Sequence, residues 1–228
     1  MPEALAQFPN RRPRGRPVIH FPNEEPSHVE TRPSGLGLTL GLAACSNTWE
    51  TAYEQLDPAQ TASWRVASVD VAVPETLTTS EENSYTPDFD IVWHGEPAGD
   101  RRAQAAAILR EGIEKGAAGL RGKTRVRIVA TLGQFHAITP VVRENLQNSG
   151  VHNIQYSVQV FDARTGAALT EPQPVKAEFP ALVGAAGDEA DARGLTQRVQ
   201  IVNQIALVTQ NWLGTGPDPR GSFQRRGR

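Results

Sequence analysis

The spacing of hydrophobic residues divides the second part of the chain into strands and helices. Apolar and polar side chains alternate in residues 124–138, where Val126, Ile128 and Leu132 share one phase. A period of two is typical of a β-strand with one buried face. The same pattern, together with β-branched residues, predicts three further strands, at residues 64–73, 153–161 and 169–179.

Two of these strands are expected to be irregular. The hydrophobic phase changes inside residues 64–73, which predicts a β-bulge near Ala67. Gly133 is expected to shift the register of the strand that contains it. The hairpin loop at residues 162–166 contains Gly166, which can adopt a positive φ without strain.

Two other segments carry hydrophobic residues at helical spacing. The first begins after Asp100, whose carboxylate is a good N-cap. Its apolar stripe consists of Ala105, Leu109, Ile113, Ala117 and Leu120. The second begins near Thr196 and stops at Gly214. Its apolar stripe consists of Ile201, Ile205, Val208 and Trp212.

Together these elements predict an α+β fold. We expect an antiparallel or mixed sheet of about four strands with two helices packed on one face, in the order β-α-β-β-β-α. Each helix has one apolar face, so the simplest arrangement places both helices on the same side of the sheet.

A short apolar run lies upstream and ends in the only cysteine of the chain. Residues 35–44 are shorter than the roughly 20 residues of a membrane span but fit the hydrophobic region of an export signal. The sequence Leu42-Ala43-Ala44-Cys45 resembles the lipobox of bacterial lipoproteins. That resemblance implies cleavage between Ala44 and Cys45, and lipidation of Cys45. The alternative is a buried segment with an incidental cysteine, which the glycines in the run disfavour.

The lipobox sets the expected domain boundaries. Thirty-four residues precede the apolar run, and they are rich in proline and arginine. We interpret Val29 as the natural start, encoded by GTG. The predicted organisation is a non-native or disordered extension at 1–28, a signal peptide at 29–44, a tether at 45–63, a periplasmic domain at 64–214 and a disordered basic tail at 215–228.

The net charge and the single cysteine limit which partners and which covalent links the chain is expected to have. The formal net charge is −2, so nothing calls for a nucleic-acid partner. With its single thiol used for the anchor, the domain is expected to hold no internal disulfide. The expected partners are a membrane, reached through the lipid on Cys45, and another envelope protein. Ser46 stands where inner-membrane lipoproteins commonly carry aspartate, which favours the periplasmic face of the outer membrane over the inner membrane.

Several segments of the domain resemble those of a known family, the uncharacterised lipoproteins of photosynthetic-type alphaproteobacteria. The resemblance covers residues 64–213 and implies a compartment and a fold without an activity. Its segments are Ile91-Val92-Trp93-His94-Gly95, Gly99-Asp100-Arg101, Gln134-Phe135-His136-Ala137-Ile138-Thr139, Gly150-Val151-His152-Asn153-Ile154, Thr196-Gln197-Arg198-Val199 and Ile201-Val202.

Catalytic and metal-binding patterns are not recognisable in the domain. Its histidines are His94, His136 and His152, and no two share the spacing that places metal ligands on one element. The last two are expected to form a hydrogen-bonded structural pair across neighbouring strands. The sequence contains no nucleophile elbow, zinc-protease motif or phosphate loop, so we expect neither a catalytic residue nor a cofactor.

Four residues support one more specific hypothesis. If the loop at 89–99 packs over the end of the strand at 124–138, then Trp93, His94, Phe135 and His136 form a shallow recognition surface for an envelope protein. The alternative is that Trp93 and Phe135 close the end of the core.

Three classes of function remain open at this stage. A lipid-anchored binding or assembly factor is favoured by the anchor and the absence of catalytic motifs. An accessory lipoprotein of a lipid or small-molecule transporter would contain an apolar groove between helices and sheet. A periplasmic enzyme would contain a polar cleft with perturbed titratable groups.

Overall fold

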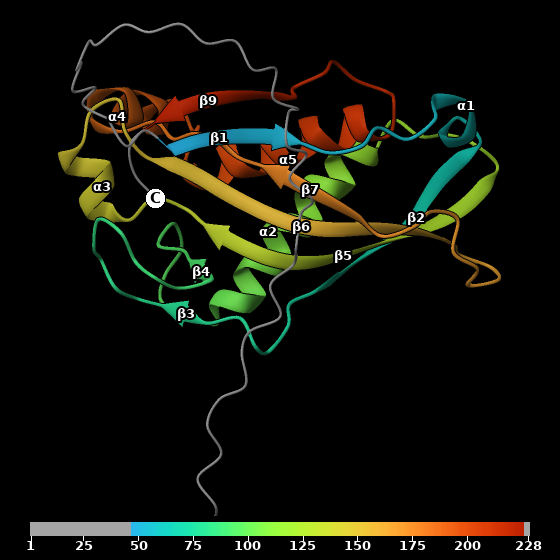
Figure 1. Cartoon of the computed structure of the whole chain (residues 1–228), viewed down its shortest axis with the longest axis horizontal. Helices are drawn as coiled ribbons and strands as arrows, with labels where there is room; N and C mark the ends of the chain where they lie inside the picture. The colour runs from blue at the N-terminus through green and yellow to red at the C-terminus, as the bar shows by residue number, and fades with distance from the viewer. Residues whose placement is uncertain (1–46, 226–228) are drawn as a thin grey trace, which may run out of the picture. The chain divides into compact units, whose positions relative to one another are not determined.

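The computed structural model describes residues 47–225, and the structural statements that follow refer to this part of the chain. These residues form five helices and one mixed sheet of nine strands (Figure 1). The elements are β1 (Asn47–Ala52), α1 (Pro58–Thr61), β2 (Trp64–Ala72), β3 (Thr79–Ser80), β4 (Ile91–Val92), α2 (Arg101–Ala117), β5 (Thr124–His136), α3 (Pro140–Asn145), β6 (Val151–Asp162), β7 (Gln173–Ala177), β8 (Phe179–Pro180), α4 (Gly184–Ala192), α5 (Gln197–Trp212) and β9 (Gly221–Arg225).

The expected sheet of about four strands, with two helices in the order β-α-β-β-β-α, is therefore wrong. Three of the additional strands, β3, β4 and β8, contain only two residues each, which is too short for any hydrophobic period. Two others, β1 and β9, lie in polar segments at the two ends of the described chain.

Strands β5 and β6 form the centre of the sheet and pair antiparallel along most of their length. Their register shifts between Leu132 and Gln134, which confirms the irregularity expected at Gly133. Strand β2 runs parallel to β5, and its register shifts between Val66 and Ser68, which confirms the bulge near Ala67. Gly166 has φ of 76°, as expected for the hairpin loop.

One edge of β5 holds two parallel neighbours in succession. Strand β2 pairs with the first part of β5, from Thr124 to Thr131, and β4 pairs with Phe135 and His136 at its carboxyl end. Strand β3 is parallel to β4 on its outer side. Since α2 connects β4 to β5, the N-terminus of α2 lies at the carboxyl ends of these strands.

The opposite edge is built from segments that the sequence did not predict as strands. Strand β1 pairs with β7 and with β9, and Asn47 is the partner of Arg225. A tether over 45–63 and a disordered tail over 215–228 were expected there, and the structure differs. Trp49 lies directly opposite Phe223 and is 7% exposed, so an aromatic pair holds these otherwise polar strands together.

Helices α2 and α5 pack against each other on one face of the sheet, behind it in Figure 1. Asp100 caps α2 by accepting a hydrogen bond from the backbone N–H of Ala103, as expected. The helices approach closely at Gly112, where a Cβ atom would lie 2.6 Å from the Cβ of Ile205. A Cβ atom on Gly116 would likewise lie 2.6 Å from the Cβ of Thr209, so positions along α2 and α5 increase together and the two helices run parallel. The ion pair of Arg198 with Glu96 places the N-terminus of α5 beside the turn that precedes α2.

Candidate functional site

The four residues expected to form a recognition surface lie at the carboxyl ends of β4 and β5. Trp93 and Phe135 are fully buried and pack edge to face, with ring centroids 5.8 Å apart. His136 is 4% exposed, and its imidazole contacts the carbonyl oxygen of Phe89. These three side chains fill the end of the core and form no exposed surface, whereas His94 is half-buried.

The Trp93 indole is held by the turn that follows it. Its Nε1–H donates to Oε2 of Glu96 at 2.9 Å. A Cβ atom on Gly95 would lie 2.2 Å from the indole ring, so this position requires glycine. The turn therefore covers the indole with backbone on one side and satisfies its polar group on the other.

An arginine at the start of α2 organises the charges around this turn. Arg101 is 5% exposed and forms a two-pronged ion pair with Glu81, with N···O distances of 2.6 and 2.7 Å. It also donates to the Glu96 carbonyl oxygen at 3.0 Å and to Oε1 of Gln104 at 2.8 Å. The hydrogen bond from Arg101 lowers the pKa of the Glu81 carboxyl.

A second arginine ties the same turn to the other long helix. Arg198, near the N-terminus of α5, pairs with Glu96 at 3.2 Å and with Glu111 of α2 at 2.8 Å. Glu81, Glu96 and Glu111 thus belong to a network with Arg101 and Arg198. A compensated network of this kind supports the positions of loops and helices, and its groups are already engaged with each other.

His152 stands apart from this network. It is fully buried on β6, packs against the Phe179 ring at 4.8 Å, and neither ring nitrogen has a hydrogen-bond partner among the described residues. The expected hydrogen-bonded pair with His136 is therefore not formed, and the residue opposite His136 is Asn153. Burial lowers the pKa of His152 to about 3, so its imidazole is neutral in the folded protein.

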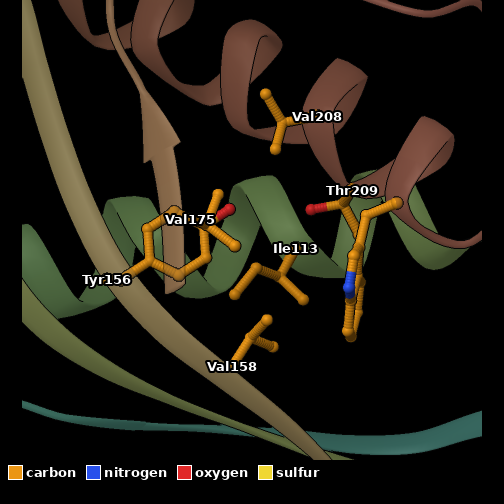
Figure 2. A pocket seen from close by; sticks show the side chains of 7 residues that line it. Ile113, Tyr156, Val158, Val175, Val208 and Thr209 are labelled. Carbon is orange, nitrogen blue, oxygen red and sulfur yellow. The ribbon is translucent and has the colours of Figure 1, made fainter. Parts of the chain in front are cut away.

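The space between the helices and the sheet is filled. Figure 2 shows the side chains of Ile113, Tyr156, Val158 and Val208 converging there from α2, β6 and α5. The gap between them leaves no room for a water-sized sphere. An apolar ligand groove at this place, as expected for a transporter accessory protein, is thus not open in the structure.

A hollow does occur at the other end of the sheet, between the outer edge of β2 and the carboxyl-terminal part of α2. It has a volume of about 390 Å³ and is open to solvent. Its lining consists of Arg65, Val66, Ala67, Ser68 and Val69 from β2, and Glu114, Ala117, Ala118, Leu120 and Arg121 from α2 and the residues after it. We call this hollow the β2 groove. The sequence contained no signal for it, because its two walls are distant in the chain.

Two further findings concern the expected chemistry. No group of three or more His, Cys, Asp and Glu side chains within residues 47–225 is arranged to hold a metal ion. No helix in this range combines the length and apolar character of a membrane span. The signal peptide, Ala44 and Cys45 lie outside the described residues.

The chain belongs to a family of unknown function, DUF6778, whose model matches residues 64–228. This match includes the whole segment over which the resemblance to uncharacterised lipoproteins was recognised. No curated protein matches the chain.

The chain is also similar to solved structures of low sequence identity. One is a predicted lipoprotein from Caulobacter crescentus, at 15% identity and a TM-score of 0.30, with 71% of this chain and 98% of that chain covered. Another is the PelC dodecamer from Paraburkholderia phytofirmans, at 13% identity and a TM-score of 0.32, with 72% and 97% covered. At these TM-scores neither protein informs the function of this chain.

Proposed function

We propose that this protein is a cell-envelope lipoprotein, anchored through Cys45, that acts as a binding or assembly factor. The observation that carries the proposal is the lipobox-like sequence Leu42-Ala43-Ala44-Cys45 placed directly before the folded domain. Strand β1 begins at Asn47, two residues after Cys45, so the whole described sheet follows the expected cleavage point.

The structure supports a binding role over the other two classes in specific ways. The interior between sheet and helices is closed, which speaks against a lipid or small-molecule carrier. Two arginines and three glutamates near the carboxyl end of β5 are engaged in ion pairs, with Arg101 bonded to Glu81 and Arg198 bonded to Glu96 and Glu111. A hydrolytic or acid–base enzyme needs a titratable group that is free to reach its substrate. His94 at this end has an Nε2 without a hydrogen-bond partner among the described residues, but that atom is buried.

Placement follows from the residue after the cysteine. Ser46 favours the periplasmic face of the outer membrane. With several acyl chains, each adding roughly 0.8 kcal/mol per buried methylene, the anchor would be effectively permanent. The domain would then act close to the bilayer and recognise a partner within the envelope.

Labelling with an alkyne analogue of palmitate in a Gram-negative host tests the anchor. The wild-type chain should incorporate the label and fractionate with membranes, and mass spectrometry should find an acylated N-terminal cysteine. Cys45→Ala should abolish the label and leave the chain uncleaved, because the thiol is the acceptor.

Ser46→Ala is the matched control, since it changes the neighbouring residue and keeps the lipobox. It should be labelled like the wild type. An unacylated Cys45 thiol on an uncut wild-type chain would overturn the proposal.

A further inference from the structure

The outer edge of β2 is unpaired within the described part of the chain. Strand β2 pairs with β5 on its inner side, and no described strand pairs with its outer side. Such an edge offers backbone N–H and C=O groups to another extended chain. Arg110 of α2 donates to the Val69 carbonyl oxygen at 3.2 Å, so this acceptor is already bonded and an added chain would pair with the part of β2 before Val69.

The β2 groove runs beside this edge and has the composition of a peptide site. Its apolar lining comes from Val66, Ala117 and Leu120, and its volume of about 390 Å³ is within the range of small binding pockets. An extended segment that pairs with β2 would place alternate side chains into this hollow. The groove thus provides side-chain contacts next to a source of backbone hydrogen bonds.

Positive charge on the groove lacks a carboxylate partner. Arg65 and Arg121 line it, and neither forms an ion pair within residues 47–225. The Arg121 guanidinium donates to the carbonyl oxygens of Ala118 and Leu120, so its charge is bonded to backbone and not to a carboxylate. Arg125 lies directly opposite Arg65 on β5 and is likewise without an ion pair there. Glu114 is the carboxylate among the lining residues. The balance of charge favours an acidic occupant.

The position of the groove selects a protein partner over the bilayer. The registers of β1, β7, β6 and β5 place Asn47, the first described residue, at the carboxyl end of β5 (Figure 1). Trp64 and the groove lie at its amino end. Since β5 contains 13 residues, the two ends are about 40 Å apart.

We propose that the β2 groove binds an extended acidic segment of a partner protein, which adds a strand to the outer edge of β2 and places carboxylates on Arg65 and Arg121. The choice of an envelope partner rests on the proposed function. The binding itself does not, because it can be measured without the anchor.

The test uses the full chain with Cys45→Ala and a fluorescein-labelled nonapeptide that alternates valine and glutamate. Anisotropy should show binding, and a peptide with lysine in place of glutamate should bind at least about tenfold more weakly. In an NMR titration with the glutamate peptide, the backbone amides of β2 and of the carboxyl-terminal end of α2 should show chemical-shift changes. Raising the salt concentration should weaken binding, because the contacts are exposed ion pairs.

Variants localise the site. Arg65→Glu with Arg121→Glu should lower the affinity at least about tenfold. Arg164→Glu is the matched control: Arg164 is exposed on the hairpin at the same end of the sheet and does not line the groove, so binding should stay within about twofold. Circular dichroism should show that all variants fold.

Four results would overturn the proposal. These are no binding of the glutamate peptide, equal binding by the double variant, amide shifts confined to other strands, or a dimer that occupies the β2 edge. Capture of the chain by phosphatidylglycerol vesicles, lost with the same double variant, would assign the groove to lipid headgroups instead. Each result is independent of acylation at Cys45, so the two proposals fail separately.

Discussion

The two ends of β5 differ in whether their arginines have carboxylate partners. At the carboxyl end, Arg101 is 5% exposed and bonded to Glu81, Glu96 and Gln104, and the rings of Trp93 and Phe135 are fully buried. At the amino end, Arg65 of β2 lies directly opposite Arg125 of the neighbouring strand β5. Both arginines are exposed, and neither has a carboxylate partner in the described structure. Exposed charge is screened by water and costs little to keep, so arginines without carboxylate partners beside an open strand edge stay available to an acidic partner.

The aromatic residues at the carboxyl end of β5 show how burial decides between two interpretations of the sequence. The sequence offers two interpretations of Trp93 and Phe135: a recognition surface together with the neighbouring histidines, or rings that close the end of the core. The structure uses them as core, and they are fully buried. A cluster of aromatic residues indicates core packing when its polar atoms already have hydrogen-bond partners. The Trp93 indole is such a case, since its N–H donates to Glu96.

The largest expected effect is therefore at the carboxyl end. Phe135→Ala removes a fully buried ring that packs against Trp93, and it should lower the free energy of unfolding by about 4 kcal/mol. Arg65→Ala at the amino end should change it by no more than about 0.5 kcal/mol. Urea unfolding followed by fluorescence measures both. Similar losses in the two variants would contradict the contrast between the ends.

His152 breaks the pattern of the carboxyl end, because it is buried without a partner. Its pKa of about 3 lies below the ordinary value near 6.5, so the unfolded chain binds the proton more readily. The stability from the neutral imidazole is complete above pH 6.5 and is lost as the pH falls towards 3. The loss should be about 1.4 kcal/mol per pH unit in this window.

His152→Leu should remove that slope, so that the difference between wild type and variant changes by about 2.3 kcal/mol from pH 6.5 to 4.5. Urea unfolding at a series of pH values measures this difference. Parallel curves for the two proteins would show that His152 is protonated or solvated in the folded state.

Arg101 tests the network itself. Arg101→Gln leaves the Glu81 carboxylate and the Glu96 carbonyl oxygen without their donor, and it should cost about 2 kcal/mol. Glu81→Gln should have a smaller effect, which disappears in acid, because the pKa of Glu81 is lowered by its hydrogen bond to Arg101 and the stabilisation is lost as the pH falls through it.

Glu82→Gln is the matched control for this pair, since Glu82 is an exposed neighbour without a salt bridge in the described residues. At neutral pH, the melting temperature of Glu82→Gln should equal that of the wild type. A loss in Glu82→Gln equal to that in Glu81→Gln would show that general charge, and not the contact with Arg101, stabilises this end.

Local rules predicted much of the fold. The bulge at Ala67, the shift at Gly133, the Asp100 cap and the positive φ of Gly166 each depend on one residue and its neighbours, and all are confirmed. The two-residue strands and the polar β1–β9 pair exist because a neighbouring strand supplies their hydrogen bonds. That neighbour is distant in the sequence, so no local pattern signals it.

The same reason explains the candidate sites. The sequence pattern placed Trp93 and Phe135 at the same end of the sheet, and the structure decides for the alternative in which both rings close the core. The pairing of Arg101 with Glu81 and the meeting of Arg65 with Arg121 at one groove depend on how α2 crosses the sheet. An arginine in a polar stretch looks the same in sequence whether it is compensated or free.

The smallest expected effect concerns the amino end and has the opposite sign. Arg125→Glu replaces a repulsive cross-strand pair with an attractive one, so it should stabilise the fold by about 0.5 kcal/mol. The gain should shrink in about 1 M salt, where the Debye length falls to about 3 Å. Adding Arg65→Glu restores like charges and should cancel the gain, which a double-mutant cycle in urea measures.

The same Arg125→Glu variant should bind the valine–glutamate peptide more weakly, because it places a carboxylate beside the groove. A variant that is more stable and binds less well would mean that the chain keeps Arg65 and Arg125 together for recognition at the expense of stability. A variant that loses stability, or whose gain is indifferent to salt, would contradict the view that this end carries uncompensated charge.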